Sequence, residues 1–184
     1  MYMLRHLLSV LFILSFFDYS QAAPQDHIDY VPKYRSEQQN VLLSKISYTD
    51  RKMMVHFQYI TEKDQITIEL SGAGTETPWK LHTPARSRSG GLVKLGTITD
   101  IMVNGTLHTA HVDANQSLSL SPKKGDIITG VVHFDRLPGN IRAIHFTAGN
   151  LFVCNDLMIK DATHPLLGTQ AQMQGSIDHF HRSV

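Results

Sequence analysis

Cysteine, net charge and long hydrophobic runs are all scarce in this chain of 184 residues. One cysteine, Cys154, excludes a disulfide within the chain, so the fold must depend on an apolar core, which a chain of this length can bury. A formal net charge of +1 excludes the strongly basic surface that is typical of nucleic-acid binding. The longest apolar run, Leu7 to Phe17, is shorter than the roughly 20 residues that a helix needs to cross a bilayer. We therefore expect one folded domain with no nucleic-acid partner.

The N-terminal residues have the order of a secretory signal peptide. Arg5 and His6 precede the apolar run, and small residues follow it within a few positions. We expect cleavage after Ala22, with cleavage after Ala23 as the second choice, and a permanent membrane anchor is the weaker alternative. On this interpretation residues 1–22 are removed, the mature protein is secreted or periplasmic, and no transmembrane anchor remains.

The rest of the chain divides into three parts by pattern. Residues 23–40 are polar and contain two prolines, which indicates an extended leader or linker. Residues 41–161 contain short runs of alternating apolar and polar residues separated by turn residues, which indicates about eight to ten strands. Residues 162–184 are rich in glutamine, glycine, histidine and serine, and we expect a flexible C-terminal tail, with one further edge element as the alternative. The sequence therefore predicts an all-β protein, an antiparallel sandwich or barrel.

Two turns organise the expected strands. Asn104–Gly105 suits a type I′ hairpin turn, because both central residues of that turn need a positive φ. The second turn, Arg136 to Asn140 in GDIITGVVHFDRLPGNIRAIHF, separates two alternating runs, which we interpret as a hairpin. The alternation places five residues in the core: Ile128, Val132, Phe134, Ile144 and Phe146. His133 and His145 then point outward on the same face of the sheet.

Two stretches, residues 41–59 and 117–146, resemble small immunoglobulin-like domains found in uncharacterised secreted bacterial proteins. In the second stretch the resemblance rests on Gly130, Val132, Phe134, the loop from Asp135 to Asn140, and Phe146. It implies an immunoglobulin-like β-sandwich over residues 41–161. All of the matching residues are structural, so the resemblance implies no catalytic residue, and a function taken from it is by analogy alone.

Histidines are the metal-ligand candidates, because imidazole suits zinc and copper and all but one of the 11 histidines follow the signal segment. His133 and His145 form the more interesting pair, although the registers we consider leave them several residues apart along the hairpin. His179 and His181, in DHFHR, have a closer spacing but lie in the expected tail. The alternative, which we favour, is that these histidines simply occupy outward polar positions.

A basic loop, TPARSRSGGLVK, is a second candidate site. It carries Arg86, Arg88 and Lys94 beside two glycines. Guanidinium groups match the geometry of phosphate, sulfate and acidic sugars, so the loop is a candidate for binding an anion or a glycan. The favoured alternative is a solvated loop without a ligand.

The sequence contains neither a G-x-S-x-G nucleophile elbow nor an H-E-x-x-H zinc motif. Cys154 lies in the apolar run LFVCNDLMI, where we expect a buried thiol that acts as a small hydrophobe. We therefore predict a non-enzymatic module without a cofactor, which binds a protein or glycan at the cell surface or in the envelope, or has a structural role there. An exported copper- or zinc-binding protein is the second hypothesis. An exposed edge strand would also allow dimerisation, so the oligomeric state stays open.

Overall fold

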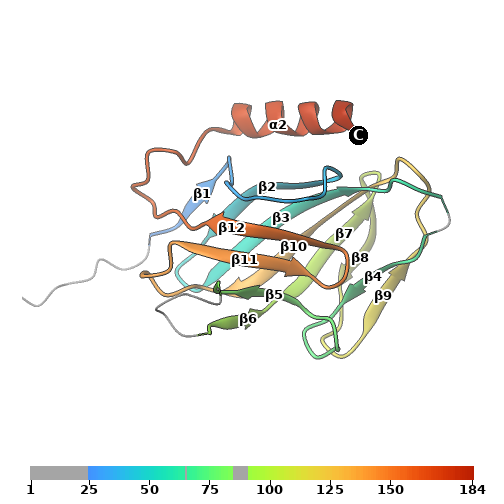
Figure 1. Ribbon diagram of the computed structural model, residues 1–184, viewed down its shortest axis with the longest axis horizontal. Helices are drawn as coiled ribbons and strands as arrows, with labels where there is room; N and C mark the ends of the chain where they lie inside the picture. The colour runs from blue at the N-terminus through green and yellow to red at the C-terminus, as the bar shows by residue number, and fades with distance from the viewer. Residues whose placement is uncertain (1–24, 65, 85–90) are drawn as a thin grey trace, which may run out of the picture.

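The computed structural model describes residues 25–64, 66–84 and 91–184. Residues 1–22, for which we predict a signal segment, and two loop residues, Arg86 and Arg88, lie outside them. The described chain contains twelve antiparallel strands and one C-terminal helix (Figure 1). The predicted all-β class is confirmed. The strands outnumber the eight to ten expected, because pieces as short as three residues, such as β1 and β6, carry no readable alternation.

The strands form two larger sheets and one small one. The six-stranded sheet contains, in spatial order, β1 (His27–Asp29), β2 (Val41–Tyr48), β3 (Lys52–Ile60), β10 (Ile127–Asp135), β7 (Thr97–Val103) and β8 (Thr106–His111). The four-stranded sheet contains β12 (Phe152–Met158), β11 (Ala143–Ala148), β5 (Trp79–His82) and β6 (Val93–Leu95). The small sheet pairs β4 (Ile68–Ser71) with β9 (Ser117–Leu120). The two larger sheets are the layers of a β-sandwich (Figure 1).

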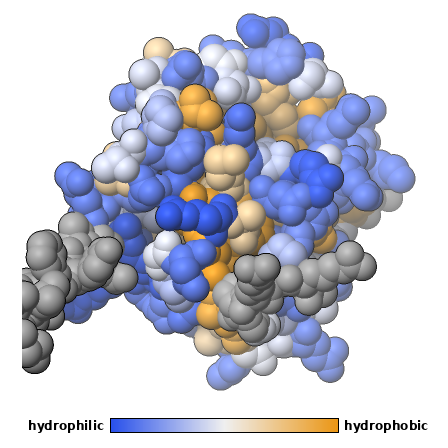
Figure 2. Space-filling view, turned by 60° about the vertical axis from the view of Figure 1, so that its left-hand side comes forward, coloured by the Kyte–Doolittle hydropathy of each residue, from blue (hydrophilic) through white to orange (hydrophobic). Residues whose placement is uncertain are grey.

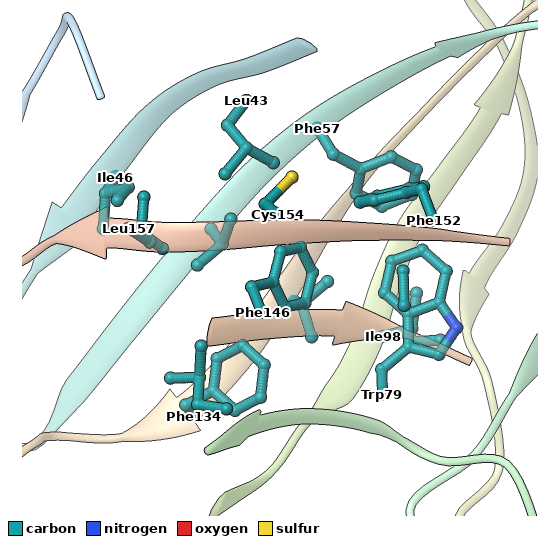
Figure 3. Packing of buried hydrophobic residues seen from close by; sticks show 14 of the residues in the cluster. Leu43, Ile46, Phe57, Trp79, Ile98, Phe134, Phe146, Phe152, Cys154 and Leu157 are labelled. Atoms are coloured by element: carbon teal, nitrogen blue, oxygen red, sulfur yellow. The ribbon is translucent and has the colours of Figure 1, made fainter. Parts of the chain in front are cut away.

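The core lies between the two larger sheets and is rich in aromatic rings (Figure 3). The ring of Trp79 on β5 is fully buried, with its centroid 4.9 Å from that of Phe57 on β3. Phe134 of β10 and Phe146 of β11 meet edge to face at 5.9 Å. Cys154 is fully buried among them, and burial raises the pKa of its thiol to about 12. The expected buried cysteine is therefore confirmed, and its thiolate form is strongly disfavoured.

The predicted hairpin around Arg136 to Asn140 is wrong. β10 pairs with β3 and β7, whereas β11 pairs with β12 and β5, so the loop between them crosses from one sheet to the other. The expected inward residues are all fully buried: Ile128, Val132, Phe134, Ile144 and Phe146. Alternation identifies the buried face of a strand but not its partner, so it could not distinguish a hairpin from a crossover.

β7 and β8 form the hairpin that Asn104–Gly105 predicts. The φ angle is 51° at Asn104 and 77° at Gly105, as a turn with two positive φ values requires. Asn104 Nδ2 donates to Asp126 Oδ1 at 2.8 Å, and Asn104 Oδ1 accepts from the backbone N–H of Ile127 at 2.9 Å. These bonds connect the turn to the start of β10.

The segment expected to be a linker is packed against the sandwich. β1 pairs with β2, and Arg35 forms an isolated antiparallel bridge with Asn155 of β12. Asp29, the last residue of β1, is fully buried. A polar composition suggested an extended leader, but polar groups of this segment contact the rest of the fold: Asp29 accepts from Lys160, and the backbone of Arg35 bonds to that of Asn155.

The C-terminal residues form a helix, α2 (Gln170–Ser183), where we expected a flexible tail or an edge element. A capping box begins it: Thr169 Oγ1 accepts from the backbone N–H of Gln172 at 3.3 Å, and Gln172 Oε1 accepts from that of Thr169 at 2.9 Å. Phe180 is its one buried residue. The expectation fails because a helix with a single buried residue has no apolar stripe for periodicity to reveal.

Candidate functional site

A cleft of about 580 Å³ opens at the end of the sandwich where β2, β10 and β12 finish. Its walls are the loop after β10, the segment after β12 and the turn after β2. The apolar part of the lining comes from Leu137, Pro138, Ile141, Ile159 and Ala162. Figure 2 shows apolar side chains gathered between hydrophilic ones on this side of the molecule. The volume is in the range of pockets that hold small organic ligands.

Two arginines, Arg136 and Arg142, also line this cleft. Arg142 is paired with Asp161, with 3.4 Å between guanidinium and carboxylate. Arg136 instead donates to two backbone carbonyls, those of Thr49 and Gln25. No carboxylate of the described residues lies within ion-pair distance of Arg136. The cleft therefore contains a half-buried positive charge without a negative partner in the described chain.

The ring of Tyr48 lines the cleft beneath Arg136, whose guanidinium carbon lies 5.7 Å from the ring centroid. Tyr48 is 5% exposed, and burial raises the pKa of its phenol, with a smaller contribution from the charge of Asp29. Its hydroxyl lies near the backbone of Lys160 but makes no hydrogen bond of normal geometry. A buried hydroxyl without a good partner is unfavourable for stability.

A buried ion pair supports the wall behind this tyrosine. Lys160 Nζ donates to Asp29 Oδ1 at 2.8 Å and to the carbonyls of Val31 and Leu166 at 2.8 and 2.7 Å. Both charged side chains are fully buried. The ring of His27 stacks on Tyr48, with 4.4 Å between centroids. These contacts connect β1 and the segment before α2 to the cleft, so its wall is built from both ends of the chain.

The structure separates His133 and His145, which the sequence analysis placed on one face. His133 lies on β10 and His145 on β11, so they point from opposite outer surfaces of the sandwich. The imidazole of His145 instead faces His82, its partner in register on β5, with 5.2 Å between ring centroids. His145 Nδ1 accepts from the backbone N–H of Asp156 at 3.3 Å, which leaves the proton of the neutral ring on Nε2. That tautomer does not offer Nε2 to a metal.

The two tail histidines lie on α2, where residues two apart point in different directions around the axis. His181 Nε2 lies 2.7 Å from Gln58 Oε1 of β3, and His179 is exposed. Among the described residues, no group of three or more His, Cys, Asp and Glu side chains is arranged to hold a metal ion. Neither histidine pair named from the sequence is therefore brought together as a chelate.

Lys94, the described member of the basic loop, lies half-buried on the edge strand β6. Arg86 and Arg88 lie outside the described residues, so the anion or glycan site stays a prediction. Neither Arg136 nor Tyr48 is part of a motif that marks it as a functional candidate in the sequence. Arg136 was assigned to a hairpin turn, and the crossover of its loop between sheets is what brings it to the cleft.

Within the described residues, no helix combines the length and apolarity that a bilayer span requires. Comparisons with protein-family models, curated proteins and solved structures find no match to this chain. Any functional conclusion must therefore come from the sites themselves.

Proposed function

We propose that this chain is an exported, non-enzymatic β-sandwich module of the immunoglobulin-like kind, which acts in the cell envelope by binding an acidic, apolar segment of a partner protein in its end cleft. The observation that carries the proposal is the unpaired guanidinium of Arg136 beside an apolar lining. An apolar side chain would fill the cleft, and a neighbouring carboxylate would neutralise Arg136 through a charge-assisted hydrogen bond.

The ionisable groups of the cleft support recognition rather than catalysis. Asp50, the other carboxylate of the lining, is paired with Arg51, and Asp161 is paired with Arg142. The ammonium of Lys160 is turned toward Asp29, away from the opening. The lining contains neither histidine nor cysteine. An apolar lining also favours a protein segment over a glycan, whose hydroxyl groups need many polar partners.

Blocking the cleft gives a direct test. Gly139 lines the cleft, and a Cβ added there meets no atom within 4 Å, so Gly139→Trp places an indole at the opening without a backbone clash. Gly175 on α2 has equally free surroundings, and Gly175→Trp is the matched control. The probes are anilinonaphthalene sulfonate, an apolar anion, followed by short peptides in which leucine flanks either aspartate or asparagine.

We expect Gly139→Trp to abolish the fluorescence enhancement of the sulfonate probe and Gly175→Trp to preserve it. Arg136→Gln should weaken binding of the aspartate peptide about tenfold, the equivalent of a charge-assisted bond worth roughly 1.5 kcal/mol. The exposed Arg182 supplies the control Arg182→Gln. Equal binding to both tryptophan variants, or of both peptides, contradicts the proposal. N-terminal sequencing of the mature protein, expected to begin at Ala23, tests export.

A further inference from the structure

His27 lies beside the end cleft, and both nitrogens of its imidazole meet backbone carbonyl oxygens. Nδ1 lies 2.9 Å from the oxygen of Gln25, and Nε2 lies 2.9 Å from the oxygen of Lys160. Both of these partner residues line the cleft. The imidazole is half-buried and stacks on the ring of Tyr48, with 4.4 Å between centroids. One side chain therefore joins the segment before β1, the segment after β12 and an aromatic wall of the cleft.

The chemistry of the two acceptors defines the protonation state that makes both bonds. A carbonyl oxygen has no proton to give, so each ring nitrogen of His27 must donate. A neutral imidazole has one N–H, whereas the imidazolium has two. Only the charged ring can therefore make both bonds at once. Loss of its proton turns a nitrogen lone pair toward one of the carbonyl oxygens.

The bond to Gln25 is the one that a neutral ring gives up. That contact is exposed, so water can replace it, whereas the contact with Lys160 is partly buried and costs more to lose. The carbonyl of Gln25 also accepts from the guanidinium of Arg136, at 3.5 Å. It is one of the two carbonyls that hold this guanidinium, and the other belongs to Thr49. Release of Gln25 therefore loosens the cation that the proposed function requires.

The charged groups around His27 determine how its proton responds to a ligand. They come from four segments of the chain: Asp26 and Asp29, Tyr48 on β2, Arg136 after β10, and Lys160 after β12. Lys160 is paired with Asp29, and burial raises the pKa of Tyr48, so its phenol stays neutral. The guanidinium of Arg136 is the unpaired charge of this group, and it opposes a proton on His27. An anion bound to Arg136 offsets that repulsion.

We propose that His27 is a proton-operated clamp between Gln25 and Lys160, which couples the binding of an anion in the end cleft to the uptake of one proton. The inference rests on the proposed function, because the anion is the carboxylate of the bound segment. A bound carboxylate favours the imidazolium, and by reciprocity the imidazolium raises the affinity for the carboxylate. Histidine is the side chain whose charge changes between about pH 5 and 8. The cleft therefore binds an acidic segment more tightly at the acid end of this range.

The test measures the affinity of the purified mature chain for the aspartate and asparagine peptides at about pH 5.5 and 7.5. His27→Phe keeps an aromatic ring against Tyr48 and removes both donors, whereas His27→Arg keeps a planar cation at both pH values. His108→Gln on the exposed strand β8 is the matched control.

We expect the parent and His108→Gln to bind the aspartate peptide about fivefold more tightly at the lower pH, the low end of coupling between linked sites. Their affinity for the asparagine peptide should not change with pH. His27→Phe should bind the aspartate peptide weakly at both pH values, and His27→Arg should bind it tightly at both. Two variants that lose the pH dependence at opposite ends of the affinity range distinguish the clamp from a general loss of structure.

Nitrogen-15 NMR of the imidazole supplies a readout that needs no ligand. At the lower pH both ring nitrogens of His27 should carry protons. At the higher pH one should be bare, and the amide of Asp26, in the same peptide group as the Gln25 carbonyl, should shift as its hydrogen bond is lost. An Asp26 amide that does not follow the protonation of His27 overturns the clamp.

The peptide measurements separate the coupling from the proposed function. Specific binding of the aspartate peptide with the same affinity at both pH values overturns the coupling alone, as does an unchanged pH dependence in His27→Phe. Failure of both peptides to bind at either pH overturns the proposed function and the coupling with it.

Discussion

At the scale of single residues, the buried ion pair between Lys160 and Asp29 has the largest predicted effect on stability. Lys160→Ala leaves the carboxylate of Asp29 buried without its counter-charge, and removing one partner of a buried pair typically costs about 3–5 kcal/mol. We expect a loss of this size in the free energy of unfolding, measured by urea denaturation. The double variant Asp29→Leu with Lys160→Met removes both charges and should lose less than Lys160→Ala alone.

Arg142→Gln is the control for this measurement, because its ion pair with Asp161 is exposed and such pairs contribute about 0–1 kcal/mol. A double variant that is less stable than Lys160→Ala would contradict the explanation by uncompensated charge. The sequence gives no local sign of this pair. Lys160 follows the strand run LFVCNDLMI like an ordinary solvated residue, and its carboxylate partner is 131 positions away.

At the scale of elements, the alternation of apolar and polar residues correctly predicted which face of β10 and of β11 is buried. It did not predict which strands these two pair with. Val132 and Phe146 are both in the core as expected, yet their strands belong to different sheets. The turn at Asn104–Gly105 was predictable because its two positive φ values are a local requirement of the backbone. The end cleft was not predictable in the same way, since Arg136 and Tyr48 meet only through the pairing order of distant strands.

The helix α2 supplies the prediction at this scale. Phe180, its one buried residue, is 6% exposed, so Phe180→Ala should cost about 1.5–3 kcal/mol of docking free energy, the value of burying one phenylalanine side chain. In hydrogen–deuterium exchange we expect faster exchange of the amides of α2 and unchanged exchange in β3 and β10. Gln174→Ala, on the exposed side of the same helix, is the control. Equal acceleration in the sheets would show that α2 is not a separate unit.

At the scale of the whole molecule, the leader, the sandwich and the C-terminal segment form one structure. Lys160 joins β1 to the loop before α2, and His181 reaches Gln58 on the outer face of the six-stranded sheet. Composition suggested loose ends because polar residues are common in both termini. Amino-acid composition does not show which backbone carbonyls or side chains such residues contact, as Lys160 and His181 do here.

Acid sensitivity of the whole fold follows from its partly buried histidines. Burial lowers the pKa of His56 to about 4 and also lowers the pKa values of His82 and His133, whereas an unfolded histidine titrates near 6.5. Between about pH 6.5 and 4 the unfolded chain therefore binds more protons than the native state, and the free energy of unfolding falls as the pH falls. Above about pH 6.5 these groups contribute no slope. Hydrogen bonds lower the pKa values of the exposed carboxylates of Asp126 and Asp135. These two groups therefore affect the free energy of unfolding only at lower pH, as the pH falls through the pKa of an unfolded aspartate and below it.

Urea denaturation at about pH 8, 6 and 4.5 measures this dependence. We expect the parent protein to lose stability between the two lower pH values. The variant His56→Gln should lose less stability over this range, because it removes the histidine whose pKa burial lowers to about 4. His108→Gln changes an exposed imidazole on β8 and should retain the slope of the parent. A slope that His56→Gln leaves intact would show that other groups control acid unfolding, since a neutral amide at position 56 binds no proton in either state.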